Sequence, residues 1–288
     1  MKFFVLLVMP LLAADPFLLL RQGDSATIDA RAAKPDGSTA LMYAVLTADA
    51  GAVRNLLERG ADVNAANRDG YTALHFAVYD DVKTSLLLAK GADAKAATTA
   101  GVTPLLVAAG RPGAIETVKL LLAAGADPNV ANRGGLTPID RAAAAGDVIV
   151  LRALFDGGAK IAAKSPAVYH SVKVSCQPCA ELLLEKGAGV NEIGARRETA
   201  LHNAAIRHHL PLMKMLLSKG ATVDTQDLRG YTALMRTAIS FDRDGAATAL
   251  LLKAGAKTDV PDEDGNTALT MALRFGDTAI AKLLREAG

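Results

Sequence analysis

Residues 56–78 read LLERGADVNAANRDGYTALHFAV, and this stretch decides the fold of the chain. Its two leading leucines belong to an apolar helix, and Gly60 stands where that helix ends in the left-handed conformation that only glycine adopts without strain. The Asp-Gly pair at 69–70 is a tight-turn signal of the hairpin kind. Thr72 then caps a new helix, because its hydroxyl can accept a backbone N–H that lacks a partner in the first turn.

The same unit recurs down the chain, and such a repeat dictates the fold. Caps of first helices are predicted at Thr39, Thr72, Thr103, Thr137, Ser165, Thr199, Thr232 and Thr267. Terminators of second helices are predicted at Gly60, Gly91, Gly125, Gly158, Gly187, Gly220, Gly255 and Gly288. Each terminator stands 12 positions before the next cap (60 to 72, 91 to 103), except that 158 to 165 is 7.

Two short motifs carry a family resemblance. TALH stands at residues 72–75 and 199–202, TPL at 103–105, and GADVN at 60–64. These motifs resemble the TPLH and GADVN signatures of the ankyrin repeat, and the resemblance covers roughly residues 36–288. It implies an all-α ankyrin-repeat solenoid of helix-turn-helix units joined by β-hairpin-like fingers, with about eight repeats and an N-terminal half-repeat cap.

Bulk composition excludes several classes of partner. The chain has 288 residues, a net charge of +2 and 22% charged residues, so no electrostatic case exists for nucleic acid or an anionic membrane. A solenoid of this length needs no single large core, because each repeat buries its apolar face against its neighbours. We expect a monomer that binds another protein, with no nucleic acid and no stable membrane insertion.

The first 35 residues differ from the repeats. Residues 1–14, MKFFVLLVMPLLAA, have the charged start, apolar run and small residues of a secretory signal peptide, so we expect a secreted or periplasmic protein. The alternative is an N-terminal capping helix in a cytoplasmic protein, but an end cap needs a polar outer face. Residues 15–35 are then expected to form the capping half repeat, and residues 36–288 the ankyrin repeat domain.

No enzyme constellation is found in the sequence. It contains no GxSxG, GxxxxGK or HExxH motif, so we expect no catalytic residue, no cofactor and no metal. The glycines of 110–113 and the acids of 262–266 fall at turns of the repeat and are interpreted as turns. The ankyrin resemblance implies that His75 and His202, the fourth residues of TALH, are structural.

The sequence CQPC at residues 176–179 is the one chemical signal outside the repeat pattern. Cys176 and Cys179 open a second helix, where a helix N-terminus favours a thiolate and the spacing permits a disulfide. The alternative function is therefore an exported redox or metal-binding protein that uses this pair, with His208 and His209 as further metal ligands on the next turn. A purely structural disulfide, or two ordinary thiols, is the simpler interpretation.

The short link from Gly158 to Ser165 predicts a missing finger between repeats four and five. Because the stability of a solenoid is roughly a sum of neighbour interactions, we expect a weak seam there.

The resemblance also implies a concave binding groove formed by the fingers and first helices. Counting four, seven and eight positions from each cap leaves the buried stripe of the first helix and should reach this groove. The residues predicted to bind the partner are Tyr43, Phe76, Tyr79, Arg141, Asn203, Arg207, Arg236 and Arg274. Their order places aromatic side chains in the early repeats and mostly basic ones in the later repeats, which suggests a partner with an apolar segment and an acidic one.

Overall fold

The computed structural model describes residues 20, 26, 28–239, 245–274, 276 and 278–288. The expected signal peptide, residues 1–14, lies outside these residues, as does much of the expected capping half repeat. The described part of the chain contains sixteen α-helices and no β-strand. The all-helical prediction is therefore confirmed.

The helices form eight consecutive pairs. The first helices of the pairs are α1 (Ala40–Thr47), α3 (Ala73–Ala77), α5 (Pro104–Ala109), α7 (Pro138–Ala145), α9 (Ala167–Lys173), α11 (Ala200–Ile206), α13 (Ala233–Ala238) and α15 (Ala268–Leu273). The second helices are α2 (Ala50–Glu58), α4 (Asp81–Ala89), α6 (Ile115–Ala123), α8 (Val148–Asp156), α10 (Gln177–Glu185), α12 (Leu210–Ser218), α14 (Ala246–Lys253) and α16 (Ala279–Ala287).

The caps and terminators confirm the predicted register. First helices begin directly after their predicted caps, except α9, which begins two residues after Ser165. At the start of α7 the Thr137 hydroxyl accepts the Asp140 N–H at 3.3 Å. At the end of α2, Gly60 has a φ of 88° and the following N–H, that of Ala61, donates to Leu56 O at 3.0 Å. This pattern closes the helix by satisfying its last carbonyls.

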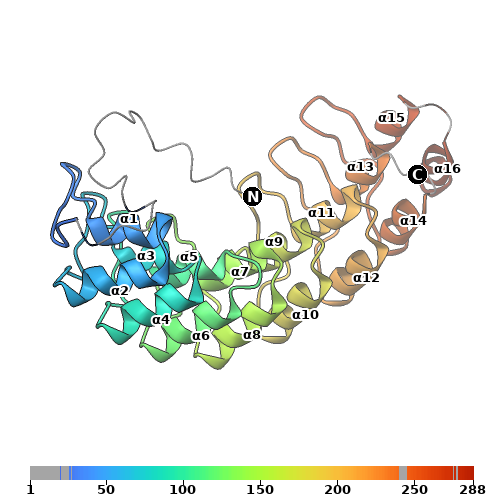
Figure 1. Cartoon of the computed structure of the whole chain (residues 1–288). Helices are drawn as coiled ribbons and strands as arrows, with labels where there is room; N and C mark the ends of the chain where they lie inside the picture. Colours follow the sequence, from blue (N-terminus) through green and yellow to red (C-terminus); the bar gives the residue numbers. More distant parts are fainter. Residues whose placement is uncertain (1–19, 21–25, 27, 240–244, 275, 277) are drawn as a thin grey trace. The chain divides into compact units, whose positions relative to one another are not determined.

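The chain divides into two compact units. The first contains residues up to 108 and residues 114–135, and the second contains residues 109–113 and 136–288. Within each unit the first helices pack side by side in one row and the second helices in another (Figure 1). The core lies between the two rows. In repeats one to seven the apolar residue two positions after the cap, such as Leu41, Leu74 or Leu201, is at most 1% exposed.

Hairpin-like fingers project between the helix pairs. Isolated antiparallel bridges join Ala33 to Thr39 and Ala66 to Thr72. Adjacent fingers are linked by backbone hydrogen bonds, which we call the finger ladder. Its members in the first unit are Arg68 N to Asp36 O (2.9 Å), Thr99 N to Asp69 O (2.8 Å) and Arg133 N to Ala100 O (2.9 Å). In the second unit they are Leu228 N to Arg196 O (3.0 Å) and Glu263 N to Arg229 O (3.2 Å).

The predicted loss of a finger is confirmed. The link at residues 159–164 forms one turn, in which Ser165 N donates to Ala162 O at 3.1 Å and Lys164 adopts a φ of 61°. No finger from this link joins the ladder in the described chain. The boundary between compact units nevertheless lies one repeat earlier, at 135/136, and α7 packs directly on α9. The helix packing therefore continues across the link.

Candidate functional site

The predicted partner-binding residues of the first unit lie on or directly after its first helices. Tyr43 is half-buried, with Lys34 Nζ 4.2 Å from its ring centroid. Phe76 is also half-buried and stacks on Tyr71, with ring centroids 5.5 Å apart. Tyr79 is 64% exposed at the turn after α3. Of the three, only Tyr79 presents most of its surface to solvent.

In the second unit, basic residues occupy the corresponding helices. Each first helix carries one Lys or Arg within it or at the residue directly after it: Arg141, Lys173, Arg207, Arg236 and Arg274. All but Arg236 are exposed. The one acid on these helices, Asp140, is 2% exposed and hydrogen-bonded. We call Arg141, Lys173, Arg207 and Arg274 the basic row; in the first unit, none of the three first helices carries a Lys or Arg at these positions.

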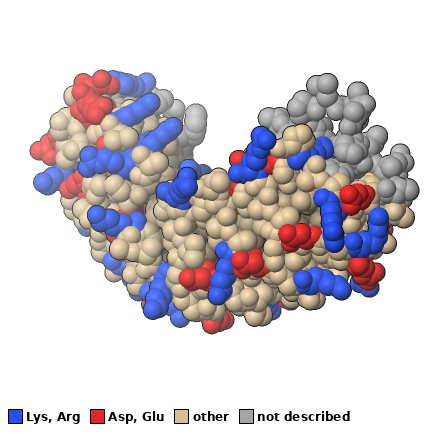
Figure 2. Space-filling view, turned by 90° about the vertical axis from the view of Figure 1, so that its left-hand side faces the viewer, with Lys and Arg blue, Asp and Glu red and all other residues tan. Residues whose placement is uncertain are grey.

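The basic row does not belong to a field of a single charge. Figure 2 shows one face of the molecule, on which Lys and Arg lie among Asp and Glu. One member of the row, Arg274, donates to Asn266 Oδ1 at 2.6 Å and so is held by its own finger. Exposed cations also lie on the second helices of this unit, such as Arg152 of α8 and Lys214 of α12, so positive charge is not confined to its first helices.

The side chain of Arg236, which was predicted to face the groove, is largely buried in contacts with other residues. Its side chain is 15% exposed and forms ion pairs with Glu198, at 2.9 Å, and with Asp227, which is 2% exposed. Its guanidinium carbon also lies 5.1 Å from the Tyr231 ring centroid. Burial opposes ionisation of Asp227, but hydrogen bonds from the Arg229 and Tyr231 N–H groups and from Arg236 leave its pKa below the usual value. Arg236 thus serves to join neighbouring fingers and helices.

Glu198 connects this ion pair to the preceding repeat. Its second carboxylate oxygen accepts the Tyr169 hydroxyl at 3.1 Å. Burial, and then the charge of Glu198, raise the pKa of Tyr169. The Tyr169 ring lies directly against Gly194, where an added Cβ would stand 2.4 Å from a ring carbon. Asn203 is half-buried at the same place, and its side chain acts on the Tyr169 hydroxyl in the opposite direction, lowering that pKa.

Sequence reasoning missed this network, although one signal was visible. Glu198 stands directly before the cap Thr199, a position that Tyr71, Val102, Leu136 and Tyr231 fill in other repeats. A carboxylate among aromatic and aliphatic residues needs a partner when it is partly buried. Arg236 is that partner.

In repeats two, four and six, the residue three positions after the cap connects its repeat to the next. His75 Nδ1 accepts the Thr72 N–H at 3.1 Å, so Nε2 carries the proton and donates to Val102 O at 3.0 Å. His202 makes the same pair of bonds, with Tyr231 O at 2.8 Å. Burial lowers the pKa of both imidazoles, which favours the neutral form. Both are structural, as the resemblance implied.

Asp140 takes this histidine's place in repeat four. Its Oδ2 accepts the Thr137 N–H at 2.9 Å, and its Oδ1 accepts the Ser165 hydroxyl at 2.5 Å. The second bond spans the short link from α7 to the start of repeat five. A side-chain contact therefore connects the repeats where the finger is missing.

Cys176 and Cys179 form a disulfide at the start of α10. Cys176 is half-buried and Cys179 is fully buried. The Cys179 N–H points to Cys176 Sγ at 3.3 Å. No group of three His, Cys, Asp or Glu able to hold a metal ion occurs among the described residues, so His208 and His209 do not complete a site with this pair there.

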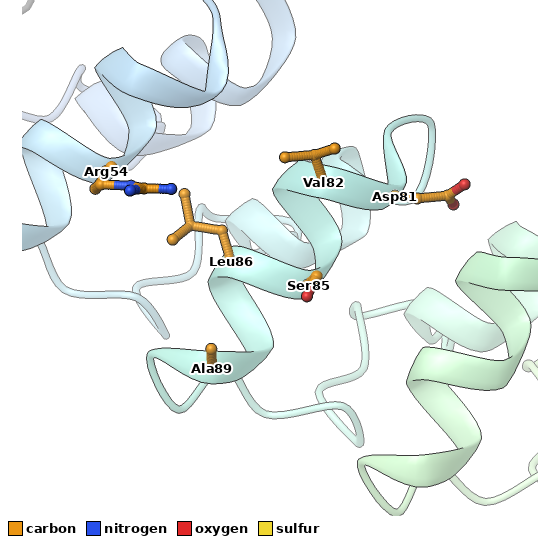
Figure 3. A pocket seen from close by; sticks show the side chains of 6 residues that line it. All are labelled: Arg54, Asp81, Val82, Ser85, Leu86 and Ala89. Atoms are coloured by element: carbon orange, nitrogen blue, oxygen red, sulfur yellow. The ribbon is translucent and has the colours of Figure 1, made fainter.

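One further depression lies on the outer helices of the first unit. Figure 3 shows Arg54 of α2 reaching toward Leu86 of α4, with Val82, Ser85 and Ala89 along the same helix. Its lining residues belong to the groove between two neighbouring second helices.

No helix in the described chain has the length and apolar character needed to span a membrane.

Family models match most of the chain. The model described as "Ankyrin repeats (3 copies)" matches residues 16–96, 163–227 and 201–288, and "Ankyrin repeats (many copies)" matches residues 105–155. Among solved structures, the ankyrin repeat domain of human ASB11 is similar, with a TM-score of 0.64 over 76% of this chain and 98% of that one. At 23% identity, that likeness shows the fold alone.

Sequence relatives match over shorter stretches. The Ankyrin repeat and LEM domain-containing protein 1 homolog of Caenorhabditis elegans is 48% identical over 66 residues, which are 22% of this chain and 9% of that protein. The human Notch-regulated ankyrin repeat-containing protein is 44% identical over 45 residues, 16% of this chain and 40% of the relative. The chain thus spans less than half the length of either relative.

Proposed function

This chain belongs to the ankyrin repeat family, and from that premise we propose that it is a non-enzymatic scaffold whose first helices and fingers bind another protein. Ankyrin repeats are general protein–protein interaction modules. What is particular to this chain is the chemistry of its first helices, because a repeat surface is generic in plan and individual in detail.

The observation that carries the proposal is the basic row. Arg141, Lys173, Arg207 and Arg274 are exposed, and no exposed acid stands among them on these helices. Arg274 lies near enough to Asp262 for its charge to help lower the pKa of that carboxyl, so the attraction rests on Arg141, Lys173 and Arg207. Exposed cations attract a complementary acidic surface and speed its association. The second unit therefore selects an acidic segment of its partner. Arg236 takes no part, because Glu198 and Asp227 already neutralise it.

The first unit offers different chemistry. Tyr79 is the most exposed of its aromatic residues, and Phe76 and Tyr43 stand half-buried on the same row of helices. Tyrosine is favoured at interface hot spots, since its ring provides contact area and its hydroxyl a hydrogen bond. We assign an apolar segment of the partner to this unit.

The test begins with affinity capture of the partner from the native compartment, followed by binding measurements on purified proteins. Arg207→Ala should weaken binding several-fold at low salt and less at high salt, because salt screens exposed charges. Tyr79→Ala should weaken binding at all salt concentrations. The matched control is Lys214→Ala, an exposed cation on the second helix α12. If Lys214→Ala weakens binding and Arg207→Ala does not, the surface has been assigned to the wrong row of helices.

We also propose that the protein is secreted or periplasmic. The support is the apolar run in residues 1–14 and its small residues before a cleavage point. The intact mass of the protein from its native host tests this: the mature form should lack about the first 14 residues. A soluble protein that retains Met1 would favour the cytoplasmic alternative.

A further inference from the structure

We propose that Cys176 and Cys179 form a dithiol–disulfide exchange site, whose substrate is a cysteine pair flanked by apolar side chains on another protein. This site lies at the turn between α9 and α10 and is independent of the proposed scaffold function.

The two sulfurs differ in access. Cys176 is half-buried at the surface of the turn, whereas Cys179 is 0% exposed within α10. Ser175, directly before the pair, has a φ of 59°, which is uncommon for a residue with a side chain. Because Cys176 is the more exposed of the two residues, its Sγ is the sulfur that an incoming thiolate would attack, while Cys179 is shielded and suited to act as the leaving group.

The helix start favours the anion that exchange requires. Cys176 is the N-cap of the nine-residue helix α10, and its Sγ accepts the Cys179 N–H at 3.3 Å. Pro178 has no N–H, so the N–H of Cys179 is the donor directed at this sulfur, and the positive end of the helix dipole adds to its effect. Such surroundings stabilise a thiolate.

An exposed apolar side chain lies beside Cys176. Val174 is 47% exposed, and the adjacent turn at Gly146 approaches so closely that a Cβ there would lie 3.3 Å from Val174 Cγ2 and 3.6 Å from the Cys176 Cβ. Ile149, three residues beyond that turn, is 61% exposed. A substrate with apolar residues beside its cysteines would cover Val174 and Ile149 while its sulfur meets Cys176.

The exchange needs a substrate dithiol as the second reactant, which is oxidised as the protein disulfide is reduced. A substrate thiolate attacks Cys176 Sγ, the Cys176–Cys179 bond breaks, and Cys179 leaves as a thiolate that takes a proton from water. The second substrate thiol then loses its proton and attacks the substrate sulfur of the mixed disulfide, which releases Cys176. Two electrons and two protons have moved: the substrate dithiol is oxidised to a disulfide, and both protein cysteines are reduced.

The experiment uses two single-cysteine variants of the full chain, which serve as matched controls because both lack the disulfide. Each is mixed with oxidised glutathione and with an oxidised leucine-flanked CxxC peptide, and mixed disulfides are followed by intact mass. Cys179→Ser should form them at least about tenfold faster than Cys176→Ser, because only Cys176 is accessible. Equal rates, or faster reaction of Cys176→Ser, would overturn the assignment.

Two further measurements cover the apolar surface and the wild-type protein. Val174→Ser should slow exchange with the leucine-flanked peptide but not with glutathione, whereas Ile193→Ser, 46% exposed on a finger, should change neither. An unchanged rate of exchange with the peptide for Val174→Ser contradicts the substrate class.

Should a cysteine variant fail to fold, the wild-type protein is reduced with dithiothreitol and briefly alkylated. Cys176 should carry the label first. A disulfide that resists excess dithiol peptide refutes the proposal.

Discussion

The two units join their repeats by different means. In the first unit, backbone hydrogen bonds run from finger to finger, from Asp36 through Arg68 to Arg133. In the second unit the finger before repeat five is absent, and side chains make connections that the first unit lacks: Asp140 with Ser165, Tyr169 with Gly194 and Glu198, and Arg236 with Glu198. The backbone ladder resumes only beyond repeat five, from Arg196 to Leu228 and from Arg229 to Glu263. A solenoid can therefore lose a finger where specific side-chain contacts replace the ladder.

The same division appears in the surface chemistry. The first helices of the first unit carry no Lys or Arg and present Tyr43, Phe76 and Tyr79, whereas those of the second unit carry one base each. Four of these bases are exposed, and one, Arg236, has been taken into the contacts between repeats. A basic residue on a first helix can thus remain exposed or become part of the contacts between repeats, according to whether partly buried acids stand next to it.

The largest effect expected from breaking the second unit's contacts is that of Arg236→Ala. It leaves the buried Asp227 and the half-buried Glu198 without their cation, and should lower the free energy of unfolding by about 3 kcal/mol. Urea denaturation measures this. Arg207→Ala, an exposed member of the basic row, is the matched control and should change stability by less than about 0.5 kcal/mol. Similar losses for the two would mean that the ion pairs contribute nothing specific.

Asp140→Ala should cost about 2 kcal/mol, because the Thr137 N–H and the hydroxyls of Thr137 and Ser165 lose a buried acceptor. Hydrogen exchange should then show α9 opening more readily than in the wild-type protein, which creates the weak seam that the short link alone suggested. Ser165→Ala removes only the bond across the link and should have a smaller effect of about 1 kcal/mol. Unchanged exchange in α9 for both variants would show that helix packing alone holds the link.

Gly194→Ala tests the close approach of Tyr169. The new methyl group would stand 2.4 Å from a ring carbon, and the repacking should cost about 1.5 kcal/mol. Gly134→Ala is the control in a finger of the first unit, where a Cβ would meet only the end of the Asn132 side chain, at 3.3 Å. In the Tyr169→Ala background, Gly194→Ala should cost little more, since the clash is gone. If Gly194→Ala costs as much in the Tyr169→Ala background as in the wild-type protein, the strain does not come from the Tyr169 ring.

The smallest effect is on pH dependence. Burial lowers the pKa of His75 in the first unit and of His170 and His202 in the second. Because the unfolded histidines take up protons near pH 6.5 while the folded ones resist, stability should be complete above that pH and fall as the pH decreases through it. Urea denaturation between pH 7.5 and pH 5 measures the slope, and His202→Ala should reduce it. An identical slope in the variant would show that His202 does not contribute to the pH dependence of stability.

The sequence predicted the architecture well because the repeat has strong local signals. Caps such as Thr137 and terminators such as Gly60 act within a few residues, and repetition fixes their register. The missing finger was also visible, as a count of residues between Gly158 and Ser165. The consequence was harder to predict, because the Asp140–Ser165 bond depends on side chains 25 residues apart.

The candidate surface was predictable only in part. Counting from the caps indicates which helix face a residue occupies, and Tyr79, Arg141, Arg207 and Arg274 are indeed exposed. It does not show what lies beside the residue in the next repeat. Arg236 and Tyr169 both contact Glu198, so their environment is set by residues of three different repeats.

The position of Glu198 has a consequence for modularity. In the first unit, His75 and Asn64 reach main-chain atoms of the next repeat, which every sequence supplies. A repeat there could be duplicated or removed with its neighbours still offering the required acceptors. Glu198, by contrast, needs a tyrosine from the repeat before it and an arginine from the repeat after it. Repeats five, six and seven thus depend on one another's side chains, and recombination within them would separate groups that the neighbouring main chain cannot replace.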